Sequence, residues 1–170
     1  MKPQHYPPTA QIPAPGQESV WDYPRPPRLE PANRHIRIVH AGIVLAETTR
    51  AHRILETSHP PVYYIPQDDI QMAYLQPVAG KSSFCEWKGV AMYYDLVLPS
   101  ASVAAAAWSY HRLMPAYLVI KDALAFYAGK LDACYVDGEQ VTPQPGSFYG
   151  GWINSWVCGP FKGEAGSMGW

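Results

Sequence analysis

Short runs of alternating apolar and polar residues are spread over the middle of the chain. Alternation places every second side chain on the same face, which is typical of a half-buried β-strand. This pattern, together with β-branched and aromatic residues, predicts strands over residues 35–39, 43–46, 62–65, 84–89, 90–98, 103–110, 126–127 and 133–136. Turn residues at Ala41-Gly42, Gly89 and Asp137-Gly138 separate neighbouring runs into hairpins.

Helical patterning is confined to two short segments. Residues 66–72 begin with proline followed by two acids, which favour the first turn of a helix, and predict one or two helical turns. Residues 115–124 begin with proline and carry Leu118, Ile120 and Leu124 as an apolar face, which predicts a helix. We therefore expect a mainly β fold with short helices.

The two ends of the chain differ from its middle in composition. Nine of the 18 prolines lie within the first 31 residues, and proline removes a backbone donor from a helix or sheet. This segment should be an extended arm, with Trp21 and Tyr23 packed on the body. The last 28 residues combine glycine with aromatic residues, which predicts an irregular tail clamped onto the body. We therefore divide the chain into an arm (1–33), a core (34–142) and a tail (143–170).

Charge and cysteine content exclude several classes of protein. The chain has 13 basic and 14 acidic residues, so it lacks the positive excess that drives nucleic-acid binding. Its cysteines, Cys85, Cys134 and Cys158, are odd in number and widely spaced, which argues against a disulfide scaffold and a structural zinc site. No apolar run reaches the roughly 18 residues of a membrane span, and the N-terminus has no apolar signal core. We expect a soluble cytoplasmic protein with no nucleic-acid or membrane partner.

Familiar catalytic motifs are absent from the sequence. It contains no GxSxG, HExxH or phosphate-binding glycine loop. Asp68 and Asp69 are adjacent and point in different directions on a strand or a helix, so they do not suit a two-metal site. We expect no metal and no cofactor.

The segment from Cys85 to Lys88 is the most informative. On a strand, alternation places Cys85 and Trp87 on one face, and Glu86 and Lys88 on the other. Cys85 is then either an inert small hydrophobic residue or a thiolate activated by a nearby cation such as Lys88, Lys121 or a histidine.

Two polar residues in a proline-bounded loop are further candidates. His59 precedes Pro60-Pro61 and is either bonded to nearby backbone or part of a site. Glu56 is either a general base or a charged loop residue. Aromatic residues also occur on nearly every predicted strand. They build either a core and its rim or, with Lys88 and Lys121, a pocket for an organic ligand.

Several segments resemble the domain-of-unknown-function family 427 (DUF427). They are LETSHPPVYYIP at 55–66, CEWKG at 85–89 with Ala91 and Tyr93, AWSY at 107–110, AFY at 125–127, DGE at 137–139, PQPGSFYGGW at 143–152 and GPFKG at 159–163. The similarity covers residues 19–170, and the tail is similar to that of the longer bacterial members. Ser147 stands where those members usually have glycine.

The resemblance implies a β-tent, or Mss4-like, fold. In that fold two small antiparallel sheets meet at an angle and leave a cleft between them. The family also carries a nucleotidyltransferase-like label, although no carboxylate pair suited to Mg²⁺ is apparent. The polar positions matched to the family, and so expected in the cleft, are Glu56, Tyr64, Cys85, Lys88, Tyr93, Trp108, Tyr110 and Lys121.

These observations predict a protein that binds, and in one version transforms, a small organic or nucleotide-like ligand in an aromatic-lined cleft. The expected catalytic residues are Cys85, Lys88 and Glu56, and the expected ligand-binding residues are Tyr64, Tyr93, Trp108, Tyr110, Lys121 and His59. One alternative is an interaction or homo-oligomerisation module that uses the arm and the tail. The other is the nucleotidyltransferase-like activity that the family label suggests.

Overall fold

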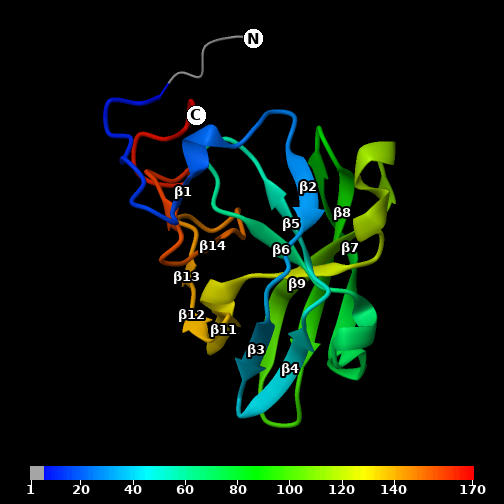
Figure 1. Ribbon diagram of the computed structural model, residues 1–170. Helices are drawn as coiled ribbons and strands as arrows, with labels where there is room; N and C mark the ends of the chain where they lie inside the picture. Colours follow the sequence, from blue (N-terminus) through cyan, green and yellow to red (C-terminus); the bar gives the residue numbers. More distant parts are fainter. Residues whose placement is uncertain (1–5) are drawn as a thin grey trace.

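Three antiparallel sheets form the body of the protein in a computed structural model that describes residues 6–170 (Figure 1). Sheet I has the order β10 (Leu124–Phe126), β9 (Ser102–Leu113), β8 (Gly89–Val97) and β7 (Leu75–Cys85). Sheet II has the order β12 (Glu139–Gln140), β11 (Ala133–Val136), β3 (Ile36–His40) and β4 (Ile43–Thr48). Sheet III has the order β2 (Arg28–Pro31), β5 (His52–Leu55) and β6 (Val62–Tyr64).

Short elements connect and border these sheets. The parallel pair β1 (Glu18–Ser19) and β15 (Val157–Cys158) and the antiparallel pair β13 (Thr142–Pro143) and β14 (Trp152–Ile153) join the ends of the chain to the body. The helical segments are 3-10 turns: η1 (Val20–Asp22), η2 (Gln67–Asp69), η3 (Met72–Tyr74), η4 (Pro115–Ile120) and η5 (Ala128–Lys130). The predicted mainly β fold with short helices and the predicted hairpins are confirmed.

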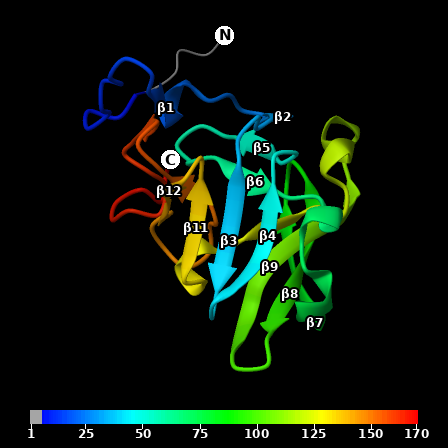
Figure 2. The same cartoon turned by 60° about the horizontal axis from the view of Figure 1, so that its bottom comes forward.

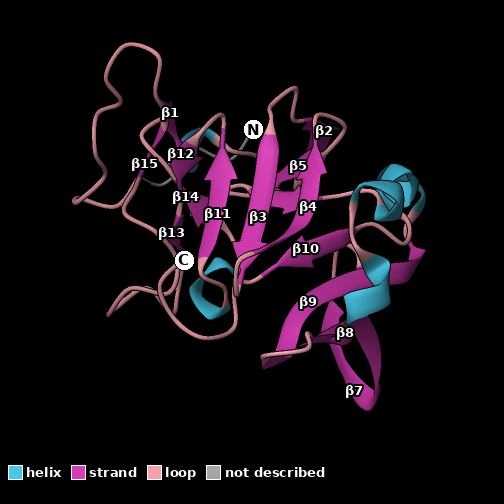
Figure 3. Ribbon diagram, turned by 90° about the horizontal axis from the view of Figure 1, so that it is seen from below, coloured by secondary structure: helices cyan, strands magenta, loops and turns pink. Residues whose placement is uncertain are grey.

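The main core lies between sheets I and II. Strands β11, β3 and β4 run side by side as one layer (Figures 2 and 3). Ile36 and Leu45 of this layer are fully buried in one cluster with Leu96 of β8 and Phe126 of β10. Burying a side chain of this size stabilises the fold by roughly 1.5 to 3 kcal/mol. The alternation along β8 and β9 sends the remaining side chains to the opposite face of sheet I.

That opposite face carries a second, aromatic cluster. Tyr93 of β8 and Trp108 and Tyr110 of β9 pack there with Tyr64 of β6. Ala91 lies opposite Tyr110, and Tyr93 lies opposite Trp108, so antiparallel register places these side chains on one face. Sheet I therefore has a closed core on one side and an aromatic surface on the other.

The arm is more than a wrapping segment. Its residues 28–31 form β2, which pairs with β5, so sheet pairing begins before the core boundary predicted at residue 34. Prolines were expected to keep this extended arm out of sheets, but Pro31 ends an edge strand, a position that tolerates proline. Residues 1–5 of the predicted arm lie outside the described residues.

The arm and the tail pack on each other. Trp21 lies edge-on to Trp170, with ring centroids 5.1 Å apart, and its Nε1 donates to the Pro160 carbonyl at 2.9 Å. The predicted packing of Trp21 and Tyr23 on the body is confirmed, since both are buried in a cluster with Leu55. Trp21 and Tyr23 of the arm are thus covered by the same chain.

The predicted helix over 115–124 is wrong. The chain forms the 3-10 turn η4 instead, and Leu124 already belongs to β10. Tyr117 and Ile120 are buried three residues apart, which matches three residues per turn, whereas Leu118 is 54% exposed. The apolar face that a helical period would require is therefore absent from this segment.

The resemblance implied two sheets, whereas the described residues form three larger sheets and two small strand pairs. The Mss4-like relationship itself stays a prediction. Between residues 6 and 170, no helix has the length and apolar character needed to cross a membrane.

Candidate functional site

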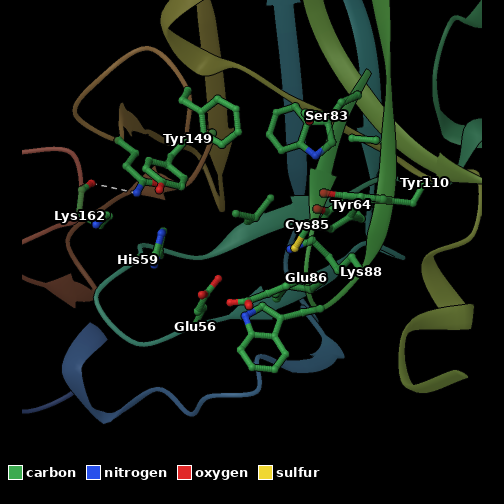
Figure 4. Close-up of a pocket in the computed structure, with 18 of the residues that line it drawn as sticks. Glu56, His59, Tyr64, Ser83, Cys85, Glu86, Lys88, Tyr110, Tyr149 and Lys162 are labelled. Atoms are coloured by element: carbon green, nitrogen blue, oxygen red, sulfur yellow. Dashed lines mark hydrogen bonds between the residues drawn. The ribbon is translucent and has the colours of Figure 1, made fainter. Parts of the chain in front are cut away.

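A half-open pocket of about 660 Å³ lies between the aromatic face of sheet I, the loop after β5 and the tail (Figure 4). Every predicted site residue except Lys121 lines it: Glu56, His59, Tyr64, Cys85, Lys88, Tyr93, Trp108 and Tyr110. Lys121 is exposed just after η4 and lies outside this pocket, so the structure does not bring it together with the other predicted site residues. Its prediction rested on the family resemblance and on its charge as a possible activator of Cys85, and neither of these fixes its position in space.

The pocket floor, which we define as Tyr64, Cys85, Lys88 and Tyr110, brings polar atoms together at one end of the pocket (Figure 4). Tyr64 is 1% exposed, Tyr110 5% and Lys88 9%. Neither the Tyr64 nor the Tyr110 hydroxyl donates a hydrogen bond to a protein acceptor within residues 6–170. By contrast, the Tyr93 hydroxyl bonds to Ser83 Oγ at 2.8 Å.

A tight turn places Lys88 beside Cys85. Residues 86–88 form the turn between β7 and β8, so the predicted strand alternation over 85–88 is wrong, and Cys85 and Lys88 line the same pocket. Gly89 ends this turn with φ of +115°, and a Cβ there would lie 2.7 Å from the Arg112 carbonyl oxygen. Glycine is therefore required to return the chain into β8 with Lys88 directed inward.

The Lys88 ammonium favours its charged form. Burial acts to lower its pKa, but interactions with Tyr64 and then Cys85 outweigh this effect and raise the pKa above its ordinary value. None of the ion pairs among residues 6–170 includes Lys88. The floor thus contains a buried positive charge without a carboxylate partner.

Cys85 is the cysteine that lines the pocket. It is half-buried, and its thiol lies beside Lys88 (Figure 4). Cys134 is buried in the main core, where desolvation raises its pKa to about 12 and makes the thiol unreactive. Both sequence interpretations of Cys85 thus have support, because it packs against the aromatic cluster and also faces the pocket.

The loop after β5 forms a second side of the pocket. His59 Nδ1 donates to the Thr57 carbonyl at 3.0 Å, which leaves Nε2 as the acceptor of a neutral ring. Burial lowers the His59 pKa and so favours this neutral form, although Glu56 opposes the shift. The predicted bond from His59 to nearby backbone is confirmed, and the residue lines the pocket as well. Glu56 forms an ion pair with Arg25 at 3.4 Å, which occupies its charge in part.

The tail supplies a wall that sequence reasoning missed. We define this tail wall as Gln144, Tyr149, Gly150 and Lys162. Gln144 is 3% exposed, accepts from Gly151 N at 3.0 Å and donates to the Lys162 carbonyl at 2.9 Å. These bonds hold two distant parts of the tail together. The signal in the sequence was the glycine- and aromatic-rich composition, which predicts packing but not its direction.

Two residues of the tail wall also stabilise the fold. Lys162 Nζ donates to the carbonyls of Ser167, Met168 and Trp170 at 2.7 to 3.2 Å. Its charge is therefore used to fold the end of the chain. Gly150 lies against Trp108, since a Cβ at Gly150 would be 2.1 Å from the Trp108 ring.

A second polar cluster lies on the other face of sheet I. His111 Nδ1 bonds to Asp122, and His111 Nε2 lies 3.4 Å from both Ser109 Oγ and the Tyr94 hydroxyl. The order of contacts resembles a Ser-His-Asp triad. However, Ser109 is fully buried, so no substrate reaches its hydroxyl. We interpret this cluster as structural.

The described residues offer no ready metal site. From residue 6 to residue 170, no group of three or more His, Cys, Asp or Glu side chains is placed to hold a metal ion.

Comparison with known proteins gives a family but no activity. None of the curated proteins matches the chain. A family model described as a domain of unknown function, DUF427, matches residues 28–137, about two thirds of the sequence. The match contains sheet III, sheet I, β3, β4 and β11, and therefore the whole pocket floor, whereas the tail wall lies beyond it. The chain belongs to the DUF427 family.

Proposed function

We propose that this protein binds a small organic molecule in the pocket between sheet I and the tail. One observation carries the proposal: polar groups of buried side chains face a 660 Å³ space that aromatic side chains surround. Among residues 6–170, the Lys88 ammonium has no carboxylate within 4 Å, and the Tyr64 and Tyr110 hydroxyls have no protein acceptor. Binding pockets for small molecules combine such apolar walls with a few convergent polar groups. The pocket is large enough for a ligand of drug-like size.

The walls and the floor differ in the contacts they offer. Tyr93, Trp108 and Tyr149 present ring faces and edges that suit a planar or apolar part of the ligand. Lys88 and Cys85 at the floor offer a cation and a thiol. An enzyme version of the proposal uses Cys85 as a nucleophile activated by Lys88. The binding version requires no reaction.

The arm and the tail support the binding proposal better than the interaction module. Trp21 and Trp170 contact each other within the chain, and Gln11 bonds to Gly159 across the same interface. The arm and the tail therefore pack within the fold, and the tail also forms one wall of the pocket.

A screen with a blocked variant tests the proposal. Wild type and Ala91→Phe are screened against a library of small organic acids, amines and neutral aromatic compounds, with thermal unfolding and tryptophan fluorescence as readouts. Ala91 lines the pocket, so a phenyl ring there should fill it and abolish stabilisation by any compound that binds wild type. Val90→Phe is the matched control, because Val90 is the preceding residue and is 48% exposed on the other side of β8.

Two outcomes would contradict the proposal. One is a library in which no compound stabilises wild type. The other is a compound that stabilises wild type and Ala91→Phe equally, which would place its site elsewhere. Val62→Phe, from β6, is a second blocking variant if Ala91→Phe does not fold, as judged by circular dichroism.

A further inference from the structure

We propose that the pocket floor is an oxyanion subsite, in which Lys88 and the hydroxyls of Tyr64 and Tyr110 bind the carboxylate or phosphate group of the ligand. This inference rests on the proposed function and adds the chemical class of the ligand group that reaches the pocket floor. It is argued from the charge, the donors and the surroundings of the floor.

The charge of the floor is unbalanced. Lys88 is 9% exposed and belongs to none of the ion pairs within the described chain. A buried ammonium without a partner is costly, because water no longer solvates it fully. Its raised pKa means that the charge is kept at neutral pH. The charge of Glu56 contributes to the raised pKa, but no carboxylate of the described chain lies within 4 Å of the Lys88 ammonium, so an anion from outside the chain would supply a direct partner.

The other polar atoms of the floor are also donors. Tyr64 and Tyr110 are at least nine-tenths buried, yet neither hydroxyl donates to a protein acceptor in the described chain. Among the described residues, every side-chain oxygen or nitrogen either has a hydrogen-bond partner in the protein or keeps some accessible surface. The two hydroxyls therefore reach the open volume of the pocket. Burial raises the pKa of both phenols, so both keep their protons.

An ammonium and two phenolic O–H groups match a group that only accepts hydrogen bonds. Carboxylate and phosphate oxygens fit this description, and charge-assisted bonds to them are the stronger kind. An amine would be repelled by Lys88. A neutral alcohol would leave the charge of Lys88 unbalanced.

The residues around the floor indicate where in the pocket the anionic end of the ligand lies. Glu56, which pairs with Arg25, and the exposed Glu86 also line the pocket, and both are less buried than Lys88. Carboxylates there disfavour a second anion at the mouth. The aromatic walls between mouth and floor suit an uncharged middle. The ligand is therefore expected to insert its anionic end first.

Two alkylating reagents that differ mainly in charge test the inference. Iodoacetate carries a carboxylate and iodoacetamide a neutral amide. Each transfers its CH₂ carbon to Cys85 Sγ as iodide leaves and the thiol proton passes to solvent. The rate at Cys85 is measured for both by mass spectrometry, and glutathione provides the ratio of the two rates for a free thiol. Cys134 and Cys158, both buried, serve as internal references.

We expect the iodoacetate-to-iodoacetamide rate ratio at Cys85 to exceed that of glutathione by about tenfold, because the floor holds the carboxylate beside the thiol. Lys88→Met should return the ratio to the glutathione value. Lys81→Met is the matched control: Lys81 is an exposed lysine on the same strand as Cys85, and its loss should leave the ratio unchanged. That control separates local binding from the general field of the protein.

Protection experiments identify the class of oxyanion. Potassium acetate and potassium phosphate are each added to the reaction of wild type with iodoacetamide, with potassium chloride at equal ionic strength as reference. Slower alkylation with acetate indicates a carboxylate subsite, and slower alkylation with phosphate a phosphate subsite. Neither effect should be seen in Lys88→Met.

The outcomes separate this inference from the proposed function. A ratio equal to that of glutathione, or a raised ratio that persists in Lys88→Met, overturns the oxyanion subsite even if the screen finds a neutral ligand. No alkylation of Cys85 by either reagent would show that the floor is inaccessible, which contradicts both. The third outcome is a screen that finds no compound, together with a raised iodoacetate-to-iodoacetamide ratio that is lost in Lys88→Met. It supports the subsite but contradicts the proposal of an organic ligand.

Discussion

Consecutive residues of β9 point to opposite faces of sheet I, and the two faces treat their polar groups differently. On the pocket face, Tyr110 lies beside Lys88 and its hydroxyl donates to no protein group within residues 6–170. On the core face, Ser109 and His111 bond to each other and to Tyr94. The same strand therefore presents open donors on one side and a closed network on the other.

The difference shows that access, rather than the types of residue, identifies a site. Ser109, His111 and Asp122 make the contacts expected of a catalytic triad, yet Ser109 has 0% exposure. The pocket floor has no familiar motif, yet its polar atoms meet open space. Residue types that suggest chemistry need a free volume next to them before they imply a function.

The largest expected effect comes from Gly150→Val, which disrupts the packing of the tail wall on the pocket face of sheet I. A Cβ at this position would lie 2.1 Å from the Trp108 ring, so the tail wall has to move. We expect the free energy of unfolding to fall by about 3 kcal/mol in urea denaturation, the upper end for overpacking. Gly169→Val is the control, since a Cβ there meets nothing within 4 Å, and its loss should stay within about 0.5 kcal/mol.

The same variant should leave the core face intact. If the urea midpoint of unfolding is the same for Gly150→Val and wild type, the tail does not pack on Trp108 in solution. The pocket then lacks the tail wall.

Ser109→Ala tests the closed network. It removes a fully buried hydroxyl that bonds to Tyr94 at 3.3 Å and to His111 at 3.4 Å. We expect a loss of about 1 kcal/mol in the free energy of unfolding, because two buried partners lose a contact. The Cys85 alkylation rates should not change, since Ser109 faces away from the pocket. A changed rate at Cys85 would mean that the two faces communicate, contrary to the comparison.

Asp122→Asn tests the charged end of that network with a smaller effect. The side chains of His111 and Asp122 are 35% and 44% exposed, so solvent screens their interaction. Asparagine also tolerates the positive φ of +63° at this position. We expect a loss of about 0.5 kcal/mol that shrinks further in 1 M NaCl. A loss unaffected by salt would indicate a role of the side chain other than pairing with His111.

The sequence predicted the aromatic face well because that face depends on a local rule. Alternation along a strand places Trp108 and Tyr110 together, and antiparallel register adds Tyr93. Short-range patterns were therefore enough for the strands and for most of the candidate site. Lys88 also lies in the pocket, although the reason is a turn and not the predicted strand alternation.

The rest of the site depends on contacts that no period encodes. Gln144 and Gly150 reach the pocket through an irregular tail, whose path is fixed by single hydrogen bonds and by the space above Trp108. Lys121 lies outside the pocket, because its prediction rested on its charge and on the family resemblance, and neither encodes where a side chain lies in the fold.

Tyr64→Phe has the smallest expected effect on stability and tests the comparison most directly. It removes the hydroxyl of a residue nearly as buried as Ser109, since Tyr64 is 1% exposed, but this hydroxyl donates to no protein acceptor among the described residues. The free energy of unfolding should therefore change by no more than about 0.5 kcal/mol, half the loss expected for Ser109→Ala. The iodoacetate-to-iodoacetamide ratio at Cys85 should nevertheless fall, because one donor of the floor is gone. A loss of 1 kcal/mol or more with an unchanged ratio would show that the Tyr64 hydroxyl is held by the protein, and the two faces of β9 would then differ in shape but not in their use of polar groups.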